Sequence, residues 1–149
     1  MPTPFESAQL LLTLYDLRRE ATMREARDFF ISFDPQTLED YMAGIMGPNT
    51  GHIRMVVTYW DMAASLVLNG AIDEKMFRDA SGEYILVFGK IEPLIPQIRE
   101  AFGSQNFAAS LEKLTLSLPN AREVIDSTVT RIRGFMAARA AANLSNAAA

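Results

Sequence analysis

The sequence predicts an all-α fold, a single-domain helical bundle of about seven helices arranged around a central helix over residues 52–69. Apolar side chains recur at steps of three and four residues along most of the chain, which is the spacing of one helix face. Residues typical of helix starts and ends interrupt this pattern, and only one short segment has the composition of a strand. A chain of 149 residues is long enough to bury the core of one domain, so we expect a single domain over 1–149.

The first helix is predicted to begin at Thr3, because Pro4 follows at the first helical position and Glu6 lies three residues after this capping hydroxyl. Apolar residues then stay on one face from Leu11 to Phe33. We therefore expect one continuous helix of about 30 residues, roughly 45 Å long.

Loop signals separate the next helices. Asp34-Pro35 repeats the start signal of the first helix and is predicted to open a short helix, which ends in the glycine- and proline-containing segment 47–51. Asn69-Gly70 favours a left-handed turn at a helix end. Asp73 is then predicted to cap a helix of about two turns over 74–80.

The segment 52–69 is predicted to be the central helix. One side carries Ile53, Val57, Trp60, Ala64 and Val67, and nearly the opposite side carries Met55, Tyr59, Met62 and Leu66. The narrow polar strip that remains between them is Arg54, Thr58, Asp61 and Ser65. A helix that is apolar on two sides belongs in the middle of a bundle.

The segment Glu83–Phe102 has conflicting signals. Tyr84–Phe88 has the composition of a strand, and Pro93 and Pro96 interrupt what would otherwise be one long helix. The apolar residues nevertheless keep a helical period through both prolines, and a lone strand would have no partner elsewhere in the chain. We predict a helix kinked near Pro93, and whether it is one kinked helix or two stays open.

Two more helices complete the prediction. Ser104 is expected to cap a helix whose apolar residues are Phe107, Leu111, Leu114 and Leu118. Pro119 is expected to open the last helix, whose apolar face is Ile125, Val129, Ile132 and Met136. From about residue 137 the chain is rich in alanine, and this tail is either a frayed helix or a disordered end.

The composition excludes many kinds of active site. There is no cysteine and a single histidine, His52, which rules out thiol chemistry, cysteine-bound metals and sites that need two imidazoles. No motif for nucleotide binding or hydrolase chemistry occurs, and no carboxylate has the spacing to His52 that a helical metal site needs. We therefore expect no enzymatic activity, no cofactor and no metal.

The charge pattern bears on partners and location. A net charge of −4 argues against a general nucleic-acid binder. No stretch is apolar for long enough to span a membrane, and the longest runs from Met62 to Ile72. Acids at Glu6 and Asp16 do not fit a secretory signal, so we expect a cytoplasmic location.

Part of the chain resembles a known family. The likeness is carried by Tyr59–Asp73, with its aromatic-acid and Gly-Ala-Ile-Asp features, by the proline-bearing segment Phe88–Glu100, and by Asn106-Phe107. Over about residues 55–115 the chain is similar to an uncharacterised bacterial all-helical family, a domain of unknown function. The likeness implies a helical fold and supplies no catalytic or binding residue. Some members look membrane-tethered through an N-terminal hydrophobic helix, where this chain offers only Leu10–Leu14.

Two pairs of residues on the central helix are candidates for chemistry. His52 and Tyr59 lie on one side, and an imidazole beside a phenol can move protons, although a histidine at a loop-to-helix junction is more often a surface or capping residue. Trp60 and Asp61 are adjacent, and desolvation beside an indole can make a carboxyl a proton donor. Adjacent helical residues do not share a face, so we favour a core indole and a structural carboxylate.

Charged residues on the terminal helices are the next candidates. Arg18 and Glu25 lie on the apolar face of the first helix, too far apart along the axis to pair with each other. A buried arginine can bind a carboxylate or phosphate ligand, but it more often meets an acid of a neighbouring helix. The last helix carries Arg131, Arg133 and Arg139, which do not share one stripe, and this argues against a phosphate patch there.

Two functions from different classes remain. The first is a non-catalytic interaction or scaffold domain of unknown role that forms a homodimer, because the first helix is apolar beyond the face that its core neighbours cover. The interface candidates are Leu10, Leu12, Leu17 and Ala21. The alternative is a module that binds a small apolar or amphiphilic molecule in an adaptable pocket. The pocket candidates are Arg18, Glu25, Met55, Trp60 and Met62.

Overall fold

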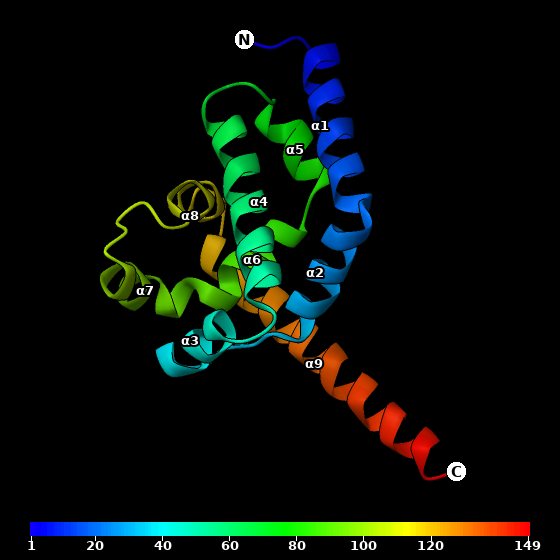
Figure 1. Cartoon of the computed structure of the whole chain (residues 1–149). Helices are drawn as coiled ribbons and strands as arrows, with labels where there is room; N and C mark the ends of the chain where they lie inside the picture. The colour runs from blue at the N-terminus through cyan, green and yellow to red at the C-terminus, as the bar shows by residue number, and fades with distance from the viewer.

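The computed structural model describes all 149 residues as nine α-helices and one 3-10 turn (Figure 1). The helices are α1 (Pro4–Arg19), α2 (Ala21–Ser32), α3 (Leu38–Met46), α4 (Thr50–Leu68), α5 (Glu74–Ala80), α6 (Glu83–Ile91), α7 (Ile95–Phe102), α8 (Ala109–Leu116) and α9 (Ala121–Ala147). The 3-10 turn η1 (Glu92–Leu94) joins α6 to α7. The predicted all-α fold is confirmed, and there are more helices than expected because two of the predicted helices are each divided.

The central helix is α4, as the sequence predicts. It lies between α2 and α8, and α3, α5 and α6 also pack against it (Figure 1). The first of its two predicted apolar sides is wholly buried, namely Ile53, Val57, Trp60, Ala64 and Val67. On the second side Tyr59 is buried and Leu66 is half-buried, whereas Met55 and Met62 are exposed, so that side is covered only in part. The next residues around the helix are buried as well, namely Val56, Tyr59 and Ala63. The core of the protein therefore forms around α4.

Packing rather than composition makes α6 a helix. The segment with strand composition, Tyr84–Phe88, lies wholly inside α6. Leu86–Ile91 are all buried, and α6 contacts α4, α8 and α9. Buried backbone amides need partners, and without a second strand these residues find them within the helix.

The kink predicted near Pro93 is the 3-10 turn η1. Pro93 and Pro96 stand in the first turns of η1 and α7, where a missing amide N–H leaves no acceptor unpaired. The segment Glu83–Phe102 is therefore helical throughout and consists of two α-helices. Gly103, with φ +61°, ends α7 in the left-handed conformation.

The first helix is broken, so the prediction of one helix of about 30 residues is wrong. Glu20 leaves the helical conformation, with φ −58° and ψ 141°, which ends α1 and lets α2 begin at Ala21. The Glu20 carboxylate accepts hydrogen bonds from the amides of Thr22 and Met23, at 3.0 and 2.9 Å. It thereby caps α2, which packs on α4. The buried residues of α2 are Met23, Ala26 and Phe30.

The start of α3 also differs from the prediction. Asp34-Pro35 does not open it, because the Asp34 carboxylate accepts hydrogen bonds from Arg133 at 2.9 and 3.0 Å. Thr37 caps the helix instead, in a capping box with Asp40. The helix therefore begins at Leu38.

The start of α8 is later than predicted. Ser104 lies outside the helix, and the residue before its first turn is Ala108, with φ +53° and no side chain that can cap. Asp61 of α4 accepts a hydrogen bond from the amide of Leu111 at 2.9 Å and so supplies the missing cap. Asp61 has the structural role that the sequence favours.

The turn between α4 and α5 agrees with the prediction. Gly70 has φ +75°, in the left-handed region. Asp73 caps α5 by accepting a hydrogen bond from the amide of Met76 at 2.8 Å. The hydroxyl of Ser7, fully buried in α1, accepts a hydrogen bond from the amide of Asp73 at 3.0 Å, and this fixes α5 against α1.

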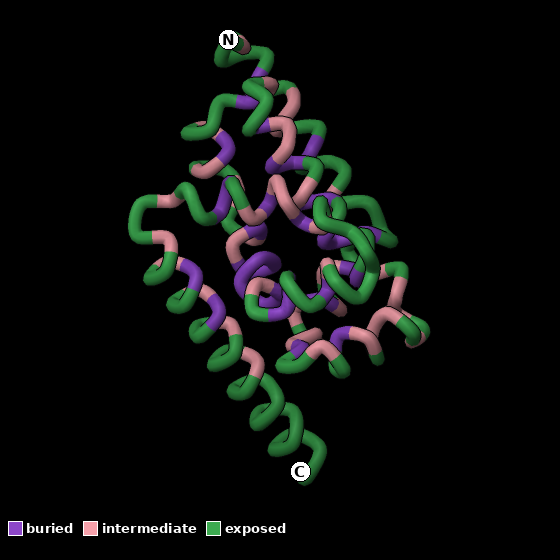
Figure 2. The backbone as a smooth tube through the Cα atoms, turned by 90° about the vertical axis from the view of Figure 1, so that its left-hand side faces the viewer, coloured by how far each residue is buried: buried purple, intermediate pink, exposed green.

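The last helix has an anchored half and a free end. It begins at Ala121, so Pro119 lies just outside it, and Ile125 and Val129 pack closely on Gly89 of α6. All residues over 137–149 are exposed, and this end projects away from the body (Figures 1 and 2). The alanine-rich tail is helical as far as Ala147.

Candidate functional site

A polar network joins three helices at the only tryptophan. The guanidinium of Arg27 on α2 donates to the carboxylate of Glu83 on α6, from Nε at 3.0 Å and from Nη2 at 2.7 Å. The indole N–H of Trp60 on α4 donates to the same carboxylate at 3.1 Å. The hydrogen bonds to Glu83 raise the pKa of Arg27. The two charges neutralise each other, so this network holds the helices together and offers no free charge.

Arg18 lies beside this network and has no carboxylate partner. Its guanidinium carbon lies 5.2 Å from the centre of the Tyr15 ring and 5.5 Å from the centre of the Trp60 ring. Such contacts attract a cation without using its N–H donors. The other half-buried arginines each bind an acid, in the pairs Arg27–Glu83, Arg78–Glu74 and Arg99–Glu112. Arg18 is therefore the half-buried arginine with a free guanidinium.

Arg18 stands at a pocket of about 310 Å³ between α1, α4 and the end of α5. The lining residues are Leu11, Leu12, Leu14, Tyr15, Arg18, Tyr59, Trp60, Ala80 and Ser81. We call it the Trp60 pocket. Its walls are mostly apolar and its one charge is a cation, which is the usual composition of a small-molecule site.

The predicted pocket residues do not all meet. Arg18 and Trp60 line the Trp60 pocket, whereas Glu25, Met55 and Met62 are exposed and lie outside it. Arg18 contributes from α1 and Trp60 from α4, so their meeting depends on how these two helices cross.

His52 and Tyr59 are separate in the structure. The Tyr59 hydroxyl donates to the Leu14 carbonyl oxygen at 2.6 Å, and burial raises the pKa of this phenol to about 12. The His52 ring packs on Phe29, with 5.9 Å between the ring centres, and its buried Nδ1 has no hydrogen-bond partner. About two helical turns lie between the two side chains, so they form no proton relay.

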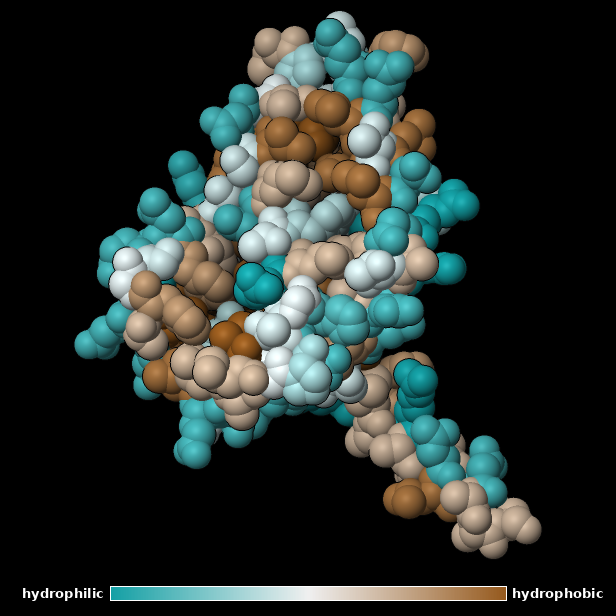
Figure 3. Space-filling model, in the orientation of Figure 1, coloured by the Kyte–Doolittle hydropathy of each residue, from teal (hydrophilic) through white to brown (hydrophobic).

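The predicted interface residues lie near the surface of the first two helices. Leu12 and Leu17 are 68% and 49% exposed, and Ala21 is exposed as well. Leu10 is half-buried and packs against the core. Figure 3 shows apolar side chains gathered in a hollow between the upper parts of α1 and α4.

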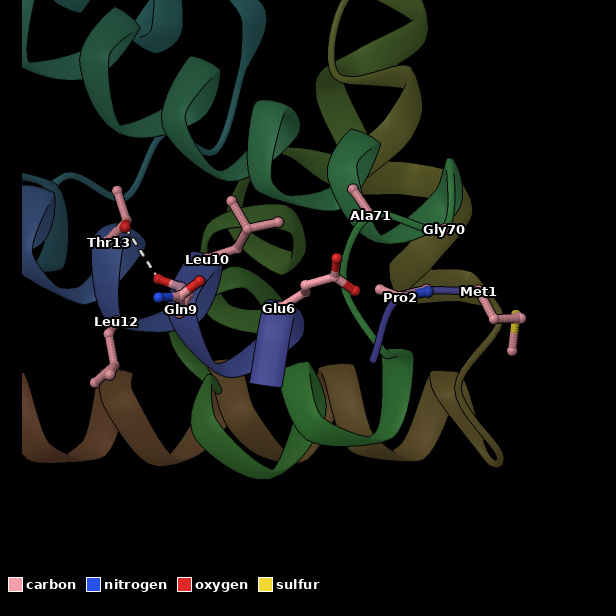
Figure 4. Close-up of a pocket in the computed structure, with 9 residues that line it drawn as sticks. All are labelled: Met1, Pro2, Glu6, Gln9, Leu10, Leu12, Thr13, Gly70 and Ala71. Carbon is pink, nitrogen blue, oxygen red and sulfur yellow. Dashed lines mark hydrogen bonds between the residues drawn. The ribbon is translucent and has the colours of Figure 1, made fainter. Parts of the chain in front are cut away.

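The most voluminous hollow, about 930 Å³, lies beside the N-terminus. Figure 4 shows its lining residues, Met1, Pro2, Glu6, Gln9, Leu10, Leu12, Thr13, Gly70 and Ala71. The Thr13 hydroxyl donates to the Gln9 carbonyl oxygen at 3.0 Å, and the Glu6 carboxylate caps the helix by accepting from the Thr3 amide at 2.8 Å. The side chains point in several directions, so this hollow is an open surface.

A second apolar pocket, of about 280 Å³, was not predicted. It lies between α3, α4 and the segment around α7, with walls that include Tyr41, Val57 and Phe107. Arg54 stands at its edge and is exposed to water. The one sequence signal for this pocket is the place of Arg54 in the polar strip of α4.

Comparison with known proteins identifies the family. The family model described as a domain of unknown function (DUF4760) matches residues 4–117 of the chain. The chain belongs to this family. The DUF4760 match contains the region 55–115 that carries the resemblance, and it extends over α1 to α8. No curated protein and no solved structure matches the chain.

The DUF4760 domain holds one deeply buried charge, Lys90 of α6. Its amine donates to the carbonyl oxygens of Phe30, Ile31 and Phe33, at 2.9, 2.6 and 2.9 Å, and so caps the end of α2. Burial lowers the pKa of Lys90 to about 8. All three N–H bonds of the ammonium are used, so Lys90 fastens α2 to α6. The sequence signal for it is a lysine inside an otherwise apolar run.

A groove of about 370 Å³ lies beside Lys90, where α9 leaves the body. The lining residues are Ile31, Ser32, Asp34, Lys90, Ile132, Arg133 and Met136. We call it the α9 groove. It involves α9, which lies outside the part of the chain that the DUF4760 family model matches.

Two further properties concern metals and membranes. No group of three or more histidine and acidic side chains could hold a metal ion. None of the helices combines the length and the apolar character that a membrane crossing needs.

Proposed function

We propose that this chain is a non-catalytic cytoplasmic interaction domain that forms a homodimer through the free end of α9. The observation that carries the proposal is an apolar stripe that continues beyond the body. Ile125 and Val129 are buried against α6, and Met136, Ala140 and Leu144 follow at helical spacing. The face that packs on the body thus runs on with nothing to cover it.

The free end of α9 has the composition of a covered helix. Over residues 134–149, Arg139 is the only charged residue, whereas a helix surrounded by water usually carries charges on its outer faces. Leu144 of the stripe is 73% exposed in the single chain. Covering one such side chain completely stabilises an assembly by about 1.5–3 kcal/mol, which favours a partner surface here.

The α9 groove supports a second copy of this chain as the partner. The groove is lined by Ile31, Ile132 and Met136, and it begins where the stripe leaves the body. If two free ends pack antiparallel, Leu144 of each copy lies near the Met136 end of its partner and reaches the mouth of this groove. A twofold axis makes the same contact twice, so one apolar stripe provides both halves of the interface.

Sedimentation equilibrium at tens of micromolar chain tests the proposal. We expect a dimer mass for the intact protein and a monomer mass for Leu144→Glu, because the carboxylate would be buried without a partner. Leu12→Glu is the matched control, since Leu12 is 68% exposed and Leu144 is 73% exposed. The control should remain a dimer.

Two results would overturn the proposal. A monomer mass for the intact chain excludes self-association at this concentration. A dimer that survives Leu144→Glu but is lost in Leu12→Glu or Leu17→Glu places the interface on α1 instead.

A further inference from the structure

The Trp60 pocket places a free cation beside apolar walls. Arg18 donates to no carboxylate of the chain, and the nearby Glu83 already accepts hydrogen bonds from Arg27 and from the Trp60 indole N–H. Asp16 is on the same helix, but residues two apart in a helix do not face each other. The guanidinium of Arg18 is therefore held in place by the Tyr15 and Trp60 rings with its donors still available.

The geometry points to a binding site for a small carboxylate with an apolar tail. The carboxylate binds the guanidinium of Arg18, and the tail lies against Leu11, Leu14 and Trp60. This site is independent of the proposed homodimer, which uses α9.

The choice of a carboxylate follows from the charge and shape of the donors. A guanidinium presents parallel N–H groups that match the two oxygens of a carboxylate. Arg18 is the only charged residue that lines the pocket, so it balances one negative charge, whereas a doubly charged phosphate would need a second cation. The remaining polar side-chain groups of the lining are the Ser81 hydroxyl, the phenols and the indole N–H of Trp60, which donates to Glu83.

The choice of an apolar tail follows from the walls and the volume. Seven of the nine lining residues are hydrophobic, among them three leucines from α1 and Trp60, and a space of about 310 Å³ accommodates a small ligand. The Tyr59 hydroxyl is directed to the Leu14 carbonyl oxygen, so it leaves its ring and not its polar end to the ligand.

Trp60 provides the measurement, because it is the only tryptophan and lines the pocket. We would titrate the intact protein with decanoate at neutral pH and follow the tryptophan fluorescence, with calorimetry as a second readout. Decanol, which has the same tail without the charge, and acetate, which has the charge without the tail, are the ligand controls. We expect a saturable change with decanoate and a response at least about tenfold weaker with each control.

Variants locate the site. Arg18→Gln should weaken decanoate binding by about tenfold or more, while Arg19→Gln, which removes the same charge from the next residue, should leave it nearly unchanged. Arg18→Lys keeps the charge without the paired N–H groups, so it should bind with intermediate affinity. Circular dichroism of each variant confirms that it is folded.

The inference fails on any of three results. The first is the absence of a saturable signal with decanoate by either readout. The second is equal affinity for decanol and decanoate, which would mean that the charge plays no part. The third is a folded Arg18→Gln variant that binds decanoate as the intact protein does.

Discussion

α6 and the free end of α9 are both helical, but for opposite reasons. α6 contains tyrosine, isoleucine, valine, phenylalanine and glycine, which are mediocre or poor helix formers, and its residues Leu86–Ile91 are all buried. The free end of α9 is rich in alanine, the best helix former, and residues 137–149 are all exposed. The first segment is a helix because of its neighbours, and the second because of its own residues.

This contrast predicts whether a substitution changes the stability of the whole domain or only the local helix content. A change in α6 alters contacts with α2, α4, α8 or α9 and should therefore change the stability of the whole domain. In the single chain, a change in the free end of α9 should alter only local helix content, because that end opens separately from the core.

The largest effect is expected from pH, through Lys90 of α6. Burial lowers its pKa from 10.5 to about 8, so the folded chain loses this proton at a lower pH than the unfolded chain. The free energy of unfolding should therefore rise between about pH 8 and 10.5, by about 3 kcal/mol, at roughly 1.4 kcal/mol per pKa unit. Urea unfolding at several pH values from 7 to about 10 measures this rise.

Two tyrosines determine the pH above which the free energy of unfolding falls again. Burial raises the pKa of Tyr41 and of Tyr59 to about 12, so their stabilising contribution is complete below about pH 10 and is lost as the pH rises further. Stability should thus be greatest near pH 10. Lys90→Met is the control and should lose the rise but keep the fall, and an unchanged rise in this variant would contradict the assignment to Lys90.

A smaller loss is expected from Gly89→Ala, at the contact between α6 and the anchored half of α9. A Cβ atom on Gly89 would lie 2.6 Å from Cγ2 of Val129 and 3.0 Å from Cγ2 of Ile125. Neither branched side chain can move without shifting α9, so we expect a loss of about 1–3 kcal/mol in the free energy of unfolding. Urea unfolding measures it, and a neutral result would mean that α9 is loosely held along its whole length.

The smallest effect is expected from the same substitution at Gly134, near the free end. A Cβ atom there would have no neighbour within 4 Å. Gly134→Ala should stabilise the local helix by up to about 1 kcal/mol. The helix signal in circular dichroism should therefore increase, while the urea midpoint stays unchanged. Measuring it in a Leu144→Glu background removes any contribution of self-association. A shifted midpoint would show that this end contacts the body.

The sequence is most informative where one signal dominates. α4 has an uninterrupted helical period, a glycine-containing loop before it and Asn69-Gly70 after it, and the first of its two predicted apolar sides is buried. The sequence around Glu20 gives no such signal for a helix end. It contains neither glycine nor proline, and glutamate is not a preferred capping residue. That break arises from the packing of α2 on α4, which a pattern along the chain does not contain.

The candidate site likewise combines residues that the sequence identifies with contacts that the sequence does not predict. Arg18 is recognisable from the sequence as a cation on an apolar face, and Trp60 as an aromatic residue of the central helix. That they line one pocket, and that Glu83 is already taken by Arg27, depends on the angles between α1, α2, α4 and α6. The break at Glu20 lets α1 and α2 take different directions, and Glu25 of α2 is exposed.

The cap that Asp61 provides to α8 has a consequence for the order of folding. The hydrogen bond from the Leu111 amide joins residues 50 positions apart, and α8 has no capping side chain of its own. Such a bond forms only after α4 is in place and the long intervening loop has closed, which costs chain entropy. α8 should therefore consolidate late in folding, after α4 is formed, and substitutions in α8 should slow folding less than substitutions in α4.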